Sequence, residues 1–442
     1  MMKFMFMLGF MLMMLMFDSM IMFFYNLCFI ITFMLIFFFM YKDILWMNIS
    51  LFFGCEYYSI LLIMLSFWIV GLMCMSLGNE EGGVMKLMVF MVLMIVLMGF
   101  FMSLDIIMFY LFFEISMIPT FFLIIYWGLN YERISAAYYL MVYMLMVSFP
   151  MLIFLMSIYK DMMSFKFTLL MEMMTFYNFN FGGYLIMYGA FFIKMPMYMF
   201  HVWLPKAHVE APVYGSMILA GVLLKMGGYG LIRFLMMFVK SSLKYNYLIF
   251  SLSLVGSVLV SLSCLVQVDM KSLVAYSSVV HMNMMMSAML TLFKLGFFGG
   301  YIMMVAHGLC SSGLFFMVDL YYKRISSRLM VLNKGMLSKM PSLAFWWFIL
   351  CSMNFSFPIS LNFVSEIFIL SVILNWDMVM LVYLMMVCFF SCAYSLYLFS
   401  YVQHGESSQY MHFMDNHQKE FIIIIIHSWP LVMLLLNLMM FM

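Results

Sequence analysis

Long apolar runs separated by short polar breaks repeat along the whole chain. Each run is about 20 residues long, the length that an α-helix needs to cross a lipid bilayer. A transmembrane β-barrel is excluded, because its strands are shorter segments in which apolar and polar residues alternate. The pattern therefore predicts an all-α membrane protein with about 14 transmembrane helices, at residues 2–17, 20–40, 57–77, 87–103, 106–127, 135–158, 184–203, 213–238, 246–266, 272–292, 297–320, 342–373, 378–402 and 421–440.

The composition agrees with this pattern. Of the 442 residues, 68% are hydrophobic and only 9% are charged, whereas a soluble domain carries roughly 25% charged residues. Methionine accounts for 65 residues, a bias typical of an AT-rich mitochondrial genome whose code reads an additional codon as methionine. The first residues contain neither a signal-peptide cleavage site nor an Arg- and Ser-rich transit peptide. We therefore expect residues 2–17 to form a membrane helix of a protein made inside the organelle.

The cysteines and glycines do not indicate a cofactor in this chain. Eight cysteines are scattered, mostly within apolar segments, and only Cys388 and Cys392 lie one helical turn apart. None has the spacing of a zinc or iron–sulfur site, so small buried hydrophobic residues are the expected role. The sequence "GGYG" at 227–230 is not a dinucleotide-binding fingerprint, because its spacing is wrong and no strand precedes it.

Ionisable side chains in the middle of apolar segments are the informative residues. A charge at the bilayer centre costs roughly 2.5–3.5 kcal/mol on insertion scales. Such side chains are therefore expected to face the protein interior or water and to pair with one another. The sites are Glu114, Lys194, Lys225, His281, His307 and Glu366.

These sites allow a structural and a functional interpretation. In the structural one, Glu114 and Lys194 are a buried ion pair that only fixes helix packing, and the histidines are neutral hydrogen-bonding groups. In the functional one, burial lowers the pKa of a lysine and raises that of a carboxylic acid, while an opposite charge restores the charged form. Such a pair is a proton switch, for which lysine is suited and arginine is not; the interior sites include no arginine. Metal binding is not expected, because no ligand spacing is present.

Two prolines predict interruptions of the membrane helices near these charges. Pro196 follows Lys194 by two residues, and Pro358 precedes Glu366 by eight. Proline removes a backbone hydrogen bond, and irregular backbone at membrane depth is tolerated only where it is buried or lines a cavity. Pro119 is expected to cause no more than an ordinary kink.

Broken helices at corresponding places in two halves are typical of inverted-repeat transporters. The spacing from Glu114 to Lys194 is 80 residues and that from His281 to Glu366 is 85. We therefore predict two inverted five-helix repeats within four regions: N-terminal helices at 1–86, a first repeat at 87–238, a second repeat at 239–402, and a C-terminal loop and helix at 403–442.

Several long motifs resemble a known family. "FFIKMPMYMFHVWLPKAHVEAPVYGSMILAGVLLKMGGYGLIR", "FYLFFEISMIPTFFLI", "QVDMKSLVAYSSVVHM", "AHGLCSSGLFF" and "PISLNFVSEIFIL" resemble the antiporter-like membrane subunits of respiratory complex I. They keep the family order over roughly residues 100 to 370. "LPKAHVEAP" indicates one particular subunit of that set, and we expect it to be a surface loop that exposes Lys206 and Glu210.

The resemblance implies roles for the charges in the first repeat. Glu114 is implied to be the glutamate that pairs with Lys194 on a broken seventh helix. Lys225 is implied to link this pair to a central hydrophilic axis.

It also implies roles in the second repeat. His281 is implied to continue the axis, with His307 as a secondary polar contributor. Glu366 is implied to be the terminal acid on a broken twelfth helix, where the sibling subunits carry lysine.

The resemblance further implies proton pumping coupled to electron transfer from NADH to ubiquinone. NADH, FMN, iron–sulfur clusters and ubiquinone are then expected in other subunits, with no cofactor or metal in this chain. The expected partners are the antiporter-like chains 2 and 5, accessory subunits and lipids, but no nucleic acid, in the mitochondrial inner membrane. The segments 160–181 and 403–420 match no family motif and receive no role.

Two alternatives remain. A subunit of a multi-subunit cation/proton antiporter would share the same Glu, Lys and broken-helix pattern. A purely structural membrane scaffold would also retain buried ion pairs.

Overall fold

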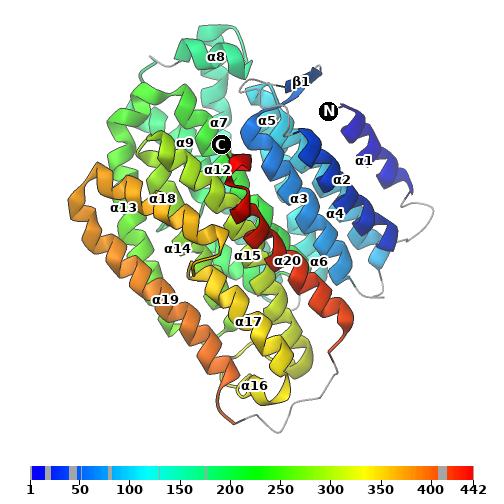
Figure 1. Cartoon of the computed structure of the whole chain (residues 1–442). Helices are drawn as coiled ribbons and strands as arrows, with labels where there is room; N and C mark the ends of the chain where they lie inside the picture. The colour runs from blue at the N-terminus through cyan, green and yellow to red at the C-terminus, as the bar shows by residue number, and fades with distance from the viewer. Residues whose placement is uncertain are drawn as a thin grey trace. The chain divides into compact units, whose positions relative to one another are not determined.

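The computed structural model describes residues 2–14, 21–38, 47–50, 52–77, 82–128, 130–174, 177–406 and 416–441 (Figure 1). The chain forms two compact units, which comprise residues 1–194 with 210–245 and residues 195–209 with 246–442. Parts of the segments 160–181 and 403–420, namely 175–176 and 407–415, lie outside the described residues.

The first unit is almost entirely helical. Within it, α3 packs on α2 and α4, α7 packs on α6 and α9, and α9 packs on α12. Its elements are α1 (Met2–Met14), α2 (Ile21–Phe38), the antiparallel strands β1 (Met47–Ser50) and β2 (Phe53–Cys55), α3 (Tyr57–Ser76), α4 (Gly83–Met102), α5 (Ile106–Ile115), α6 (Met117–Trp127), α7 (Arg133–Met162), α8 (Phe167–Met173), α9 (Phe181–Lys194), α11 (Val213–Ile218), the π-helix η2 (Leu219–Leu223) and α12 (Leu224–Met237).

The second unit is built around α15, which packs against α14, α17, α18 and α20 (Figure 1). Two helices cross the boundary in sequence: α10 (Trp203–Glu210) belongs to this unit except for its last residue, and α13 (Val239–Val266) begins in the first unit. The other elements are α14 (Met270–Leu290), α15 (Lys294–Ile325), α16 (Met336–Lys339), α17 (Pro341–Asn354), α18 (Leu361–Trp376), η3 (Met378–Met380), α19 (Leu381–Gln403), α20 (Gln418–Leu436) and η4 (Leu438–Phe441).

The all-α, polytopic membrane fold is confirmed. Within the described part of the chain, ten helical segments are long and apolar enough to cross a membrane, and three shorter apolar helices accompany them. Helices suit this composition because a bilayer offers no water to satisfy backbone N–H and C=O groups. The predicted boundaries were less accurate. The segment expected at 246–266 begins at Val239, because the polar residues of "VKSSLKYN" continue the helix instead of preceding it.

Both breaks expected at prolines are present. α9 ends two residues before Pro196, and α17 and α18 flank Pro358. In each break, the fifth residue after the last helical one has a positive φ angle, 80° at Met199 and 81° at Ile359. This left-handed backbone conformation is unfavourable for residues other than glycine, above all for a β-branched residue such as Ile359. The two breaks thus share one strained residue at the same distance from the end of the preceding helix.

The first break lies directly on α13 at Gly256. A Cβ atom added to Gly256 would lie 2.2 Å from Cβ of Tyr198, an atom fixed to the backbone of the break. We expect Gly256→Ala to lower stability by about 1–3 kcal/mol, because overpacking forces the backbone to shift. Thermal unfolding of the purified protein would measure this effect. Gly182→Ala is the matched control, since an added Cβ meets nothing within 4 Å; equal unfolding temperatures for the two variants would contradict the prediction.

Candidate functional site

Lys194 is a buried cation at a helix end. It is the last residue of α9 and only 1% exposed. Its Nζ donates to the carbonyl oxygen of Phe113 and to Oγ of Ser116, both at 3.3 Å, and lies 3.6 Å from the centre of the Phe113 ring. The C-terminus of a helix carries partial negative charge. The end of α9 therefore helps to stabilise a positive charge on Lys194.

Glu114 lies beside this lysine, at a kink between α5 and α6. The two side chains interact electrostatically, while Oε1 of Glu114 is buried without a hydrogen-bond partner among the described residues. The kink has a clear cause: Pro119 cannot donate to the carbonyl of Ile115, where α5 ends. The expected kink is thus present, and it places Glu114 and Ser116 next to Lys194. The two charges couple through space instead of forming a tight hydrogen-bonded pair.

Lys225 is the second residue of α12, two residues after the π-helix η2 ends, and is fully buried. Its Nζ donates to the carbonyl oxygen of Ala220 at 2.5 Å. A π-helical turn widens the hydrogen-bonding pattern and leaves carbonyl oxygens available to side chains, and such turns occur often at functional sites. The irregular turn therefore provides a polar site for the ammonium group inside an apolar helix.

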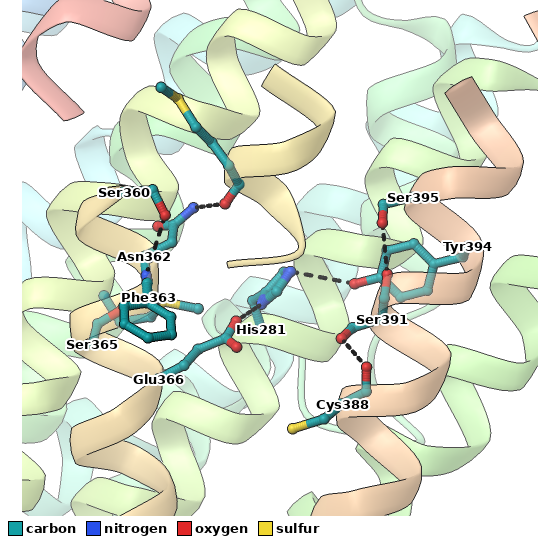
Figure 2. Close-up of polar contacts among 12 residues, drawn as sticks. His281, Ser360, Asn362, Phe363, Ser365, Glu366, Cys388, Ser391, Tyr394 and Ser395 are labelled. Atoms are coloured by element: carbon teal, nitrogen blue, oxygen red, sulfur yellow. Dashed lines mark hydrogen bonds and ion pairs between the residues drawn. The ribbon is translucent and has the colours of Figure 1, made fainter. Parts of the chain in front are cut away.

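His281 of α14 is the centre of the cluster in the second unit (Figure 2). Its Nδ1 lies 3.4 Å from Oε1 of Glu366, and its Nε2 lies 3.3 Å from the hydroxyl of Tyr394. The ring centre of His307 lies 5.6 Å from that of His281. The imidazole thus connects a carboxylate on α18 to a phenol on α19, as Figure 2 shows. His281, His307 and Tyr394 are at most 4% exposed.

A small cavity adjoins this cluster between α14, α18 and α19. It measures about 20 Å³ and is lined by polar groups of His281, Glu366 and Ser391 and by apolar side chains. A cavity of about 10–15 Å³ holds one water molecule where polar partners are present. One water therefore fits beside Glu366, whose side chain is 21% exposed.

The second break is held by hydrogen bonds that place Glu366. Nδ2 of Asn362 donates to the carbonyl oxygen of Met353 at 2.7 Å, which joins α18 to the end of α17. Ser360 caps α18 by accepting from the backbone N–H of Phe363. Glu366 therefore lies in the second turn of a helix that is fixed at its start (Figure 2).

The structure brings the six sequence-predicted residues into separate groups. Lys194 lies with Glu114, and Lys225 lies at η2, all in the first unit; the other three, His281, His307 and Glu366, gather in the second. Sequence reasoning missed Ser116 and Tyr394 as polar partners. In "SCAYSLYLF", Ser391, Tyr394 and Ser395 follow the i, i+3, i+4 spacing of one helix face, a signal that could have identified that partner.

A buried arginine corrects one expectation. The ionisable sites predicted inside the membrane helices included no arginine, yet Arg233 of α12 is only 1% exposed. Its guanidinium lies 3.2 Å from Oε2 of Glu56 and donates to the hydroxyl of Tyr229. Glu56 lies outside the membrane-spanning helix, directly before α3; burial raises the pKa of its carboxyl, and Arg233 opposes that rise. Because arginine keeps its proton, this pair anchors α12 to α3 and does not exchange protons.

The segment "LPKAHVEAP" is a second correction. It was expected to be a surface loop, but residues 203–210 form α10, because Pro205 lies in the first turn, where proline is tolerated. Lys206 is exposed as expected. Glu210 is not: it is 6% exposed and accepts from Nδ2 of Asn130 at 3.1 Å.

The described residues contain no group of three or more His, Cys, Asp or Glu side chains placed to hold a metal ion. Six of the cysteines are buried, while Cys388 and Cys392 are partly exposed. The chemistry that the clusters offer is proton exchange among Lys, Glu and His, with Tyr394 as a hydrogen-bonding partner.

Comparison with known proteins finds a matching family model and similar sequences. Residues 103–391 match a family model described as NADH:quinone oxidoreductase/Mrp antiporter, transmembrane. NADH-ubiquinone oxidoreductase chain 4 of Ceratitis capitata is 45% identical over 418 residues, which cover 93% of each chain. The protein of the same name from Aedes aegypti is 45% identical over 399 residues, with 88% of each chain covered.

Solved structures share the fold. A chain of respiratory complex I from Thermus thermophilus with bound NADH superposes with a TM-score of 0.83 at 20% identity, covering 93% of this chain and 90% of that one. A chain of the Mrp complex from Dietzia sp. gives a TM-score of 0.72 at 15% identity, covering 80% and 68%. The chain is therefore similar in fold to one chain of each assembly.

Proposed function

Because this chain belongs to the NADH:quinone oxidoreductase/Mrp antiporter membrane family, we propose that it is a proton-translocating subunit in the membrane arm of respiratory complex I. Its full-length similarity to NADH-ubiquinone oxidoreductase chain 4 from insects supports this function. The protein is then a multi-pass protein of the mitochondrial inner membrane. The observation that carries the proposal is the set of buried Lys, Glu and His side chains joined in polar clusters inside membrane helices.

The chain contributes to an oxidoreductase as one of its subunits. In this proposal NADH, FMN, iron–sulfur clusters and ubiquinone are bound by other subunits, and this chain holds no redox centre. The chain 2 and chain 5 antiporter-like subunits, accessory subunits and lipids are its neighbours. The regions 87–238 and 239–402 act as two inverted repeats, flanked by the helices of 1–86 and the end region 403–442.

The first cluster works as a charge-dependent proton switch. The ammonium of Lys194 is stabilised by Glu114, by two hydrogen-bond acceptors and by the end of α9. A neutral Glu114, or one that moves away, removes part of this stabilisation, and the desolvated lysine then releases its proton more readily. Low dielectric strengthens this coupling relative to water. In the first unit, Lys225 receives the next proton.

The second cluster exchanges protons at Glu366. Nδ1 of His281 lies 3.4 Å from Oε1 of Glu366, and an imidazole can take up a proton on one nitrogen and release one from the other. Glu366 is partly exposed and borders a cavity that fits one water molecule. The end of the relay therefore lies at Glu366, with His307 as a secondary contributor.

The proposal is tested by reconstituting the intact complex that contains this chain in sealed vesicles. We expect NADH oxidation by quinone to drive proton uptake at an unchanged rate with or without sodium, as read from a pH-sensitive dye and ²²Na⁺ flux. Sodium–proton exchange that proceeds without NADH oxidation would establish the cation/proton antiporter instead. A scaffold role would follow if neutral variants of the buried charges assembled and pumped normally.

A further inference from the structure

Tyr394 is the second hydrogen-bonding partner of His281. It lies in α19, is 0% exposed, and its hydroxyl is 3.3 Å from Nε2 of His281. On the opposite side of the ring, Nδ1 faces Glu366. Figure 2 shows the imidazole between these two groups. Both ring nitrogens therefore have a partner, and the partners differ in chemistry.

The phenol fits this place because it can both donate and accept a hydrogen bond. When Glu366 is a carboxylate, Nδ1–H of His281 donates to it, and Nε2 accepts from the Tyr394 hydroxyl. When Glu366 is protonated, its O–H donates to Nδ1, and Nε2–H donates to the Tyr394 oxygen. A donor-only or acceptor-only side chain would satisfy just one of these two tautomers, and a buried polar group without a partner is costly.

The hydroxyl is also free to rotate about its C–O bond. Among the described residues, its hydrogen bond is to His281 and not to a carboxylate or a lysine. The neighbouring Ser391 and Ser395 donate to backbone carbonyl oxygens of their own helix. At neutral pH the hydroxyl keeps its proton, because a phenol titrates near pH 10. Tyr394 can thus reorient without becoming charged.

We propose that Tyr394 is a positioning residue that holds His281 in place while the imidazole changes tautomer, so that a proton taken up at Nε2 is delivered from Nδ1 to Glu366. This inference rests on the proposed role of the second cluster in proton transfer, and assigns a new residue to it.

The proton balance of this step is simple. One proton arrives at Nε2 from water or from the side of His307, and the Tyr394 hydroxyl turns its own hydrogen away from Nε2. The imidazolium that forms releases the Nδ1 proton to the carboxylate of Glu366. His281 ends neutral with its proton on Nε2, Glu366 ends protonated, and Tyr394 retains the proton it had. One proton enters the cluster and one is stored on Glu366.

The test is Tyr394→Phe in the intact complex, which removes the hydroxyl and keeps the ring. We expect the pumping rate per assembled complex to fall about three- to tenfold. The alkaline limb of the pH profile of pumping should also move to lower pH, because the imidazolium loses a charge-assisted hydrogen bond that is worth more than the bond lost by the neutral imidazole. The titratable groups around His281 and Tyr394 that shape this profile are Glu366 on α18, Cys264 on α13, His307 and Cys310 on α15, and Cys388, Cys392 and Tyr394 on α19.

Tyr397→Phe on the same helix is the control, because it deletes the same atom outside the cluster. If Tyr394 had a purely structural role, the pH profile of pumping would be the same in Tyr394→Phe as in the unmodified complex. That result would overturn the proposal. Glu366→Gln is measured in parallel. If Glu366→Gln abolishes pumping while Tyr394→Phe has no effect, the tautomer role fails and the proposed function stands; if Glu366→Gln has no effect, the proposed function itself fails.

A second measurement needs no variant. A high-resolution map of the unmodified complex, recorded at rest and during turnover, should keep the Tyr394 oxygen within about 3.4 Å of Nε2. Separation beyond hydrogen-bond distance in both states would overturn the proposal, even if Tyr394→Phe failed to assemble.

Discussion

Replacing Lys194 by methionine is expected to lower the proton-pumping rate at least about tenfold, while the complex still assembles. Methionine keeps most of the side-chain volume and removes the only group at this site that can carry a proton as an ammonium. Without the lysine, the protein should still fold, because Glu114 can become protonated instead of remaining an unpaired buried anion. Proton uptake by vesicles during NADH oxidation would measure the loss, with the amount of assembled complex determined on native gels.

Lys240→Met is the matched control for this experiment. Lys240 lies in the same unit and is exposed at the start of α13, so its loss should leave pumping unchanged. A second variant, Ser116→Ala, removes one hydrogen bond to the Lys194 ammonium and should give a smaller reduction. Normal pumping by an assembled Lys194→Met complex would exclude the proton switch, and a failure to assemble would favour the structural interpretation of the buried pair.

The fold was predictable because each feature that defines it is local in the sequence. Apolar length sets the membrane helices, and proline sets their interruptions, so the breaks at Pro196 and Pro358 could be expected without any tertiary information. The start of α13 could not be predicted in this way, because polar residues at the end of a helix have the same low hydropathy as a loop. α10 was missed for a similar reason. Proline usually ends a helix, so Pro205 predicts a loop unless it is known to lie in the first turn.

The candidate site was predictable only in part. Charges inside apolar segments stand out individually, but their partners come from distant segments. The Arg233–Glu56 pair joins residues far apart in sequence, and no local pattern selects it. Ser391, Tyr394 and Ser395 mark a polar face of α19, but the contact of Tyr394 with His281 depends on how α14 and α19 pack.

Replacing Glu366 by glutamine is the second change expected to have a large effect, a loss of at least about tenfold in pumping. The amide has nearly the same shape and can still accept a hydrogen bond from Nδ1 of His281, so packing and ring position should persist. It cannot store a proton at neutral pH, which removes the last acceptor of the relay. Pumping per NADH oxidised, measured in vesicles that contain assembled complex, distinguishes this loss from slower electron transfer.

Glu366→Asp separates proton chemistry from polarity at the same position. The shorter side chain withdraws the carboxylate from its 3.4 Å contact with His281, but one water in the adjoining cavity can bridge the gap. We therefore expect partial activity for aspartate and almost none for glutamine, with Glu406→Gln in an exposed position as the control. Equal activity of the glutamine and aspartate variants would show that a titrating acid is not needed here. The graded result follows only if the carboxylate at 366 accepts the proton that His281 delivers.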